Sequence, residues 1–383
     1  MRCDFLILGA TGIQGRIVSR YLLEKNYKVI MCGRDKFRVK DLLARFNNTL
    51  FKYLDLRNSD DTFKTFSYFR PAVVINCAEG DWNINAMNAA LKSKVSIIDL
   101  GSDVPMTKEQ LDFHSKFKRA GILSITGCGS VPGIGNVMLR YAAEKFDEIE
   151  TIEVGFAWDS NIKKFVVPFS IQSILEEMTD PAPVIENKIM RYYDPMKTIK
   201  KLCYRNVKDS ICFFARHPET YTFFHYYKNK GVKNVRFYAG FPSHSFNVLR
   251  LFIDLGFNSK EEIFVHGNKI RPIDFLTEVL KKIKVPKGYK EMENLWVKVI
   301  GKKDSKRKEI LMECLVNTIK GWEEAGSNID TGFPAAIIAI LIKNGIISEK
   351  GSFAPEAVVP IKPFFEELKK NHMYVLENGK RIN

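Results

Sequence analysis

Three glycines near the start of the chain are spaced by three residues in the segment FLILGATGIQGR, residues 5–16. An apolar run ends at the first of them. In a strand–turn–helix unit, the first glycine permits a tight turn, the second lets the backbone approach a pyrophosphate, and the third lets helix and strand pack closely. The helix start would present free N–H groups and the positive end of its dipole to that anion. The spacing therefore predicts dinucleotide binding, with contacts from Gly9, Thr11, Gly12, Ile13, Gln14 and Gly15.

The segment VIMCGRD, residues 29–35, bears on the choice of cofactor. It places Gly33 and Arg34 where an NAD site usually has an acid for the ribose hydroxyls. A guanidinium suits a 2′-phosphate through paired, charge-assisted hydrogen bonds. We therefore predict NADP, with NAD left open because Asp35 follows at once. The other interpretation of Arg34 is a solvent-exposed residue at a helix start.

Other polar residues follow apolar segments, and ligands of parallel α/β sheets bind beyond the carboxyl ends of the strands. Asp55, in KYLDL, could reach the adenine edge. The backbone of Asn76, Cys77 and Ala78, in INCAEGD, would lie along the cofactor. In the same loop, Glu79 and Asp81 fall near the expected nicotinamide end. They are candidate proton-transfer residues, or else solvated loop acids.

These residues require a sheet to position them. Strand-like segments recur at 4–8, 28–32, 50–54, 72–77, 95–100 and 122–125 and alternate with helical stretches. This βαβ rhythm predicts an α/β fold with a doubly wound parallel sheet of the Rossmann type. After the glycine-rich segment 127–136 the rhythm changes, and strand-like segments at 150–158, 210–216, 234–241, 295–301 and 309–316 predict an α+β domain with a mostly antiparallel sheet. We predict domains at 1–128 and 129–324, with C-terminal helices at 325–383 returning to the first domain.

Composition excludes several classes of partner. The net charge is +15, but the densest basic run, 302–308, lies between two alternating apolar segments and is typical of a hairpin tip. Nucleic acid is therefore not expected. The longest apolar run, 333–342, is too short to span a bilayer, so no membrane partner is expected. Seven cysteines without a C-x-x-C pair predict no disulfide framework, no metal site and a reduced, cytoplasmic setting.

Several motifs together resemble the saccharopine dehydrogenase-like oxidoreductases, with the lysine 6-dehydrogenase branch nearest. They are GATGIQG, NCA after the fourth strand, GCGSVPGIGN at 127–136, TGFPAAIIAILIKNG at 331–345, APE at 354–356, and the segment 173–195. The resemblance implies an NAD(P)-dependent oxidoreductase that acts on the C–N bond of an amino acid or imine. It also implies a homodimer formed through the inserted domain. The chain departs from the family at Glu79-Gly80-Asp81, where relatives show GP, and at FPSH, 241–244, which matches an aromatic-Pro-Gly-His segment only in part.

Four places are candidates for substrate contacts. His244 lies in the partly matching segment and could move a proton. Cys128 lies in the glycine-rich turn, where the alternative is a buried, inert thiol. Arg236 could hold a carboxylate bidentately, or simply lie on the surface. Thr331 and Gly332 are predicted to open a helix whose N-terminus binds a substrate carboxylate.

Two other functions remain open at this stage. The first is a non-catalytic dinucleotide-binding sensor or scaffold, which would keep the glycine turn and lack the polar groups of the second domain. The second is an ene-reductase of the same superfamily with a hydrophobic substrate, which the aromatic residues from 213 to 246 would suit.

Overall fold

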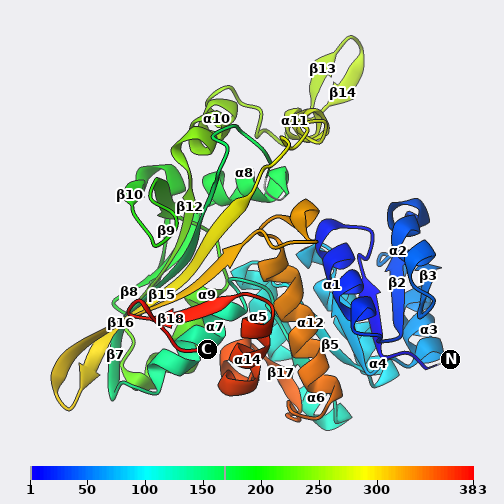
Figure 1. Cartoon of the computed structure of the whole chain (residues 1–383), viewed down its shortest axis with the longest axis horizontal. Coiled ribbons are helices and arrows are strands. Elements are labelled where there is room, and N and C mark those ends of the chain that lie inside the picture. Colours follow the sequence, from blue (N-terminus) through cyan, green and yellow to red (C-terminus); the bar gives the residue numbers. More distant parts are fainter. Residues whose placement is uncertain (1, 168–169) are drawn as a thin grey trace.

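The computed structural model describes residues 2–167 and 170–383 of the chain (Figure 1). Within these residues, the first domain is built on a seven-stranded sheet of order β17-β6-β5-β4-β1-β2-β3. Its strands are β1 (Phe5–Leu8), β2 (Val29–Gly33), β3 (Thr49–Tyr53), β4 (Val73–Asn76), β5 (Ser96–Asp99), β6 (Leu123–Ile125) and β17 (Gly351–Phe353). Every pair is parallel. The predicted Rossmann-type sheet is therefore confirmed.

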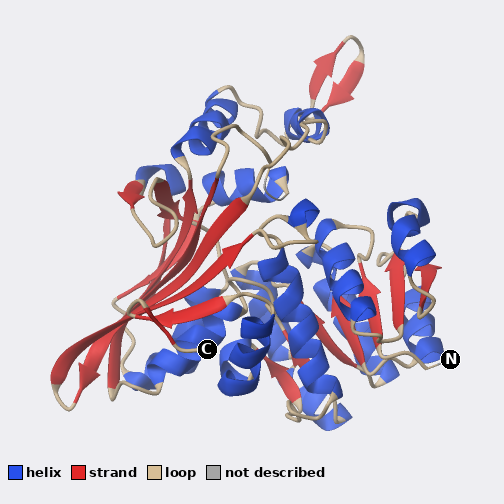
Figure 2. Cartoon of the chain, viewed as in Figure 1, coloured by secondary structure: helices blue, strands red, loops and turns tan. Residues whose placement is uncertain are grey.

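Helices cover this sheet on both faces, which is why β1 and β4 are apolar and buried at nearly every position. The helices between its strands are α1 (Ile13–Glu24), α2 (Lys40–Arg45), α3 (Ser59–Phe69), α4 (Asn83–Ser93), α5 (Val104–Asp112) and α6 (His114–Ala120). Figure 2 shows them on either side of the parallel strands. The strand order reverses between β1 and β4, so the carboxyl ends of these two strands mark the expected ligand position.

The second domain holds a ten-stranded sheet among the described residues. Its strands are β7 (Glu148–Ser160), β8 (Ala182–Glu186), β9 (Ile189–Tyr193), β10 (Lys200–Leu202), β11 (Ser210–Phe214), β12 (Asn234–Phe241), β15 (Glu291–Lys303), β16 (Lys306–Asn317), β18 (Tyr374–Glu377) and β19 (Lys380–Arg381). Its pairs are antiparallel except for β12 beside β7. The predicted, mostly antiparallel second sheet is confirmed, and the basic run lies at the tip of the β15–β16 hairpin.

The remaining helices pack around this second sheet and between the two sheets (Figure 1). They are α7 (Ile134–Ala143), α8 (Ile171–Thr179), α9 (Glu219–Tyr227), α10 (Ser243–Asp254), α11 (Pro272–Leu280), α12 (Ile329–Lys343), α13 (Pro355–Val358) and α14 (Ile361–Lys370). A small hairpin of β13 (Ile263–Val265) and β14 (Asn268–Ile270) stands away from the body. One hydrophobic core runs from Ile7 of the first sheet to Val154 of the second.

The C-terminal segment connects the two domains. Helix α12 packs on α1, and a Cβ on Gly332 would lie 2.4 Å from Ile17 Cγ2, so this close approach requires glycine. Strand β17 extends the first sheet beside β6, while β18 extends the second beside β16. The exact domain boundaries stay a prediction. None of the helices in the described part of the chain has both the length and the apolar character needed to cross a membrane.

Candidate functional site

The glycine turn joins β1 to α1 and is shaped for a phosphate. Gly9 has φ +67°, and a Cβ there would lie 2.6 Å from the Ala78 nitrogen. A Cβ on Gly15 would lie 2.2 Å from the Gly9 oxygen. Gly12 differs from both, because its Cβ would meet only the Gly9 oxygen, at 3.4 Å. Gly9 and Gly15 are therefore required by the fold, whereas Gly12 leaves open space in front of the α1 N-terminus, where a pyrophosphate fits.

A pocket of about 370 Å³ opens beside this turn. Its lining comprises Thr11, Gly12, Ile13, Arg16, Ile17, Arg20, Arg38, Leu42, Trp322, Glu324 and Ala325. Arg16 is fixed by two hydrogen bonds to the Asp41 carboxylate, at 2.9 and 2.8 Å, and it also donates to the Arg38 carbonyl. The Arg16 hydrogen bond lowers the pKa of Asp41. Arg16 thereby anchors the short helix η1 (Lys36–Val39) against the glycine turn.

Two more cationic residues, Arg34 and Arg38, follow β2, and Arg38 lines this pocket. A Cβ on Gly33 would lie 2.7 Å from Thr11 Cγ2, so the strand end and the glycine turn are in close contact. Arg34 follows directly and is exposed. The Asp35 carboxylate accepts a hydrogen bond from the Phe37 amide at 2.9 Å and caps η1. Asp35 is therefore engaged in capping, and η1 carries the exposed Arg38 to the pocket lining. Sequence reasoning did not identify Arg16 or Arg38.

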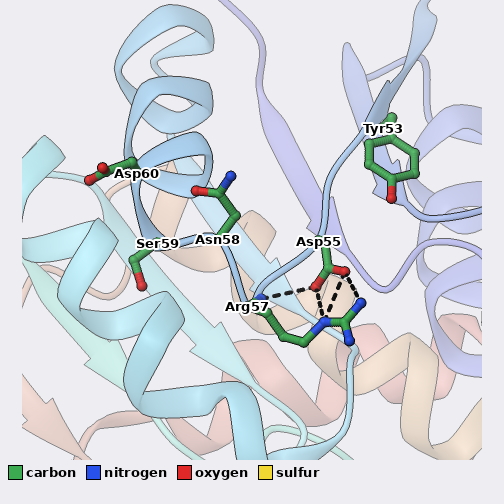
Figure 3. A pocket seen from close by; sticks show the side chains of 6 residues that line it. All are labelled: Tyr53, Asp55, Arg57, Asn58, Ser59 and Asp60. Carbon is green, nitrogen blue, oxygen red and sulfur yellow. Dashed lines mark hydrogen bonds and ion pairs between the residues drawn. The ribbon is translucent and has the colours of Figure 1, made fainter.

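Asp55 lies in a second, open pocket of about 710 Å³ after β3 (Figure 3). Its lining comprises Tyr53, Asp55, Arg57, Asn58, Ser59 and Asp60. Figure 3 shows the Arg57 guanidinium folded back on the Asp55 carboxylate, with Nε to both oxygens at 3.0 Å. This hydrogen bonding lowers the pKa of Asp55 to about 2. An adenine approaching Asp55 would therefore meet the Asp55–Arg57 ion pair and not a free carboxylate.

A buried hydrogen-bond network fixes the loops at the carboxyl ends of β4, β5 and β6. Asn76 Nδ2 donates to Asn83 Oδ1 at 2.7 Å, and Gln110 Nε2 donates to Asp99 Oδ2 at 2.6 Å. Asp99 Oδ1 accepts from the Gly101 amide at 2.8 Å and the Gly127 amide at 3.1 Å.

Gln110 Oε1 links the parts of this network, because it accepts from Asn83 and from Thr126. Burial raises the pKa of Asp99. Of these residues, sequence reasoning identified only Asn76. Polar residues at strand ends, such as Asp99, were the available signal.

The predicted proton-transfer residues come from two domains. Glu79 and Asp81 are exposed and flank Gly80, which begins η2 (Gly80–Trp82) after β4. His244 is the second residue of α10 in the second domain. Its Nε2 is buried and has no hydrogen-bond partner among the described residues, and burial lowers its pKa. The structure thus leaves all three as candidates, with Glu79 and Asp81 beside the cofactor turn and His244 on the second domain.

Two predicted substrate contacts have partners within the fold. Cys128 is fully buried, its Sγ donates to the Ile125 carbonyl at 3.5 Å, and burial raises its pKa. The alternative interpretation, a buried inert thiol, fits this position. Arg236 alternates along β12 with core residues such as Phe237 and lies on the other face of the sheet. Its guanidinium pairs with Glu153 at 3.4 Å and Glu186 at 3.8 Å.

The predicted helix start at Thr331 and Gly332 is corrected, while their role as a carboxylate site stays a prediction. Helix α12 begins at Ile329, and the amides of Thr331 and Gly332 both bond to the Asn328 carbonyl, at 3.2 and 3.3 Å. The first turn already contains a buried acid, Asp330, so a substrate carboxylate would meet like charge there. Thr331 Oγ1 instead donates to Ser130 Oγ at 3.2 Å and to Asp330 Oδ1 at 3.1 Å.

Comparison with protein families agrees with this two-domain arrangement. Residues 113–373 match the saccharopine dehydrogenase C-terminal domain, and residues 5–98 match the NAD dependent epimerase/dehydratase family. A carboxyaminopropylagmatine dehydrogenase from Synechocystis sp. is 25% identical over 95% of this chain and 94% of its own length. A carboxynorspermidine synthase from Vibrio alginolyticus is 26% identical over 98% and 93%.

Among solved structures, a saccharopine dehydrogenase (L-Glu forming) from Saccharomyces cerevisiae superposes with a TM-score of 0.77. The superposition covers 100% of both chains at 16% sequence identity. At this identity the likeness shows that the two chains share a fold over their whole length.

Proposed function

Because the chain belongs to the saccharopine dehydrogenase-like family, we propose that it is an NADP-dependent oxidoreductase that makes or breaks a C–N bond of a carboxylated polyamine. The proposed substrate class rests on two relatives, each of which aligns over more than nine tenths of this chain and of its own length. The names of both relatives describe a polyamine that bears a carboxyl group.

The cofactor part of the proposal rests on the glycine turn and its cations. Gly12 and the α1 N-terminus would hold the pyrophosphate, where the open space is. Arg34 and Arg38 would hold the 2′-phosphate, because Arg38 lines the pocket beside Thr11 and the exposed Arg34 follows Gly33, which packs against Thr11. The Asp35 carboxylate is engaged in capping η1. A nicotinamide cofactor bound there supplies the hydride carrier that C–N oxidation or imine reduction needs.

The chain's own residues have two tasks in this chemistry. The network around Asp99 holds the backbone of Gly101 and Gly127 in place, and we expect the nicotinamide end of the site beside these loops. A proton must also move at the substrate nitrogen. His244 suits this task, since burial favours its neutral form, which can accept a proton at the unpartnered Nε2.

The test is turnover of a defined panel, followed by nicotinamide absorbance. The panel comprises carboxynorspermidine, carboxyaminopropylagmatine, saccharopine and lysine. We expect NADP-dependent oxidation of one or both carboxylated polyamines to exceed oxidation of saccharopine and lysine. Faster turnover of saccharopine or lysine would contradict the substrate class, and binding of NADP without turnover of any amine or imine would support a non-catalytic sensor.

We also propose that the protein is a cytoplasmic homodimer. All seven cysteines are free thiols, which suits a reducing compartment. Light scattering of the purified protein measures its mass directly, and a mass equal to one chain would refute the dimer.

A further inference from the structure

Three carboxyl groups, two from β15 and one from α12, meet where these two elements begin. Glu291 Oε2 accepts hydrogen bonds from the amide and the hydroxyl of Ser327, at 2.7 and 3.1 Å. The side chains of Glu293 and Asp330 lie within hydrogen-bond reach of one another. Asp330 is 3% exposed, and its Oδ2 has no amide or hydroxyl donor among the described residues. We call Glu291, Glu293 and Asp330 the acidic trio.

The acidic trio has no counter-ion in the part of the chain that the structure describes. None of its three members forms an ion pair with a lysine or arginine there. Burial raises the pKa of all three, that of Asp330 to about 7. Buried carboxylates without a cation are costly, so the site must take up protons or bind a positive group. The three do not form a group placed to hold a metal ion.

The position of the acidic trio links it to the proposed reaction. The residue after Asp330, Thr331, contacts Ser130 in the glycine-rich turn that follows β6. Figure 1 shows the start of α12 between the β15–β16 hairpin and α1, on the side of the second sheet that faces the first domain. Glu293 is the least buried residue of the trio, so it lies nearest to solvent.

Trp158 supplies a second, independent sign of a ligand. It pairs directly with Glu293 across the β7–β15 register, so the two side chains emerge on the same face as neighbours. Trp158 is 2% exposed, and its indole Nε1 has no hydrogen-bond partner among the described residues. A buried N–H donor of this kind normally has an acceptor. Carboxylates and an unused donor on one face suit a ligand that carries both an ammonium and an acceptor group.

We propose that the acidic trio binds an ammonium group of the amine substrate, with Trp158 Nε1 donating to an acceptor on the same molecule. This inference rests on the proposed function and names the part of the site that recognises a polycation. The trio then acts in binding. It places the amine beside the turn that contains Ser130 and excludes neutral substrates, because only a cation compensates the buried charge.

The experiment uses the full chain with NADP⁺ bound and the variants Glu293→Gln and Asp330→Asn. Calorimetry measures the binding of norspermidine and agmatine as separate probes. Glu309→Gln is the matched control, since Glu309 lies on the same hairpin and pairs with Lys298 at the surface. We expect each trio variant to weaken both probes at least tenfold, while NADP⁺ affinity and the control stay unchanged.

A second measurement separates binding from a merely structural role. Glutamine and asparagine keep the shape of the side chains and remove unbalanced buried charge. The thermal midpoint of the ligand-free variants should therefore rise above that of the wild type, as expected where binding is built at the expense of stability. A lowered midpoint together with unchanged amine binding would mean that the trio is structural.

The remaining outcomes each decide the question. Unchanged amine affinity in both variants overturns the inference, and Mg²⁺ or Ca²⁺ binding that depends on the trio would replace the ammonium with a metal ion. If the wild type turns over a carboxylated polyamine and the trio variants do so with unchanged KM, this inference fails while the proposed function stands. If no amine is turned over although NADP⁺ binds, the proposed function itself fails.

Discussion

Substituting Arg34 or Arg38 with alanine should reduce the preference of the protein for NADP over NAD. Both arginines are exposed. Arg38, on η1, lines the pocket beside Thr11 and Gly12. Arg34 directly follows Gly33, which packs against Thr11. The 2′-phosphate is the only difference between the two cofactors. A loss confined to NADP therefore identifies the groups that read this phosphate, and we expect Arg34→Ala and Arg38→Ala each to give such a loss.

The magnitude follows from the type of bond. A hydrogen bond to a charged group contributes about 1.5–3 kcal/mol. Since about 1.4 kcal/mol is a factor of ten, each substitution should weaken NADP about 10- to 100-fold. Both groups are exposed and screened by salt, so the lower end is expected at physiological ionic strength. The double variant should lose less than the sum, because the two cations share one phosphate.

Isothermal titration with NADP⁺ and NAD⁺ at two salt concentrations provides the assay. Arg45→Ala is the control, because Arg45 is an exposed arginine of the neighbouring helix α2 that pairs with Glu24. NADP⁺ affinity should fall in the two test variants and stay constant in the control. Equal weakening of NADP⁺ and NAD⁺ would refute the reasoning, since it would mean that these arginines contact a group common to both cofactors.

Three further predictions test the site and the core. Gly12→Val should abolish dinucleotide binding in calorimetry while the circular dichroism spectrum stays native. Gly15→Val should instead destabilise the fold, because its Cβ would lie 2.2 Å from a backbone oxygen. Equal thermal midpoints for the two variants would contradict this distinction. Burial raises the pKa of Glu356 to about 7. The folded state therefore binds the Glu356 proton more tightly than the unfolded state does. The free energy of unfolding should fall by up to about 3 kcal/mol as the pH rises from about 4.5 to about 7. Glu356→Gln keeps an oxygen for Asn136 Nδ2 and should flatten that slope in denaturant titrations, and an unchanged slope would mean that Glu356 is ionised in the fold. His244→Ala should lower kcat by about 10²- to 10⁴-fold with little change in KM if His244 moves a proton, and a change in KM alone would assign it to binding.

The features that sequence reasoning identified are local ones. Gly9, Gly12 and Gly15 lie within one strand–turn–helix unit, so their spacing in the sequence is enough to predict the geometry of the turn. Arg34 is likewise positioned by the strand that precedes it. The alternation of strands and helices predicted the first sheet because each βαβ unit repeats the same local pattern. The antiparallel second sheet also followed from the long apolar segments, although β13 and β14 were not anticipated.

The features that it missed depend on contacts between distant segments. The face of β12 to which Arg236 belongs is set by register with β7 and β11, and a shift of one residue would have exchanged the two faces. Asp330 and Glu293 are 37 positions apart in the sequence and meet only because α12 begins beside β15. No motif contains such a pair. Likewise, Thr331 and Gly332 were predicted to be free because the two residues before them were not assigned to the helix.

The glycine turn and the acidic trio lie in separate parts of the chain, so each can change without the other. The dinucleotide turn is complete within the first 15 residues, so it can be retained while the second domain changes. The acidic trio depends on two elements, β15 and α12, and its neighbour Trp158 lies on a third, β7. Substituting one acid there changes the charge that a substrate must bring, and it leaves the cofactor contacts untouched. We therefore expect substrate specificity to diverge by single substitutions in the trio, whereas substitutions that alter cofactor binding fall on the glycine turn and on Arg34 and Arg38.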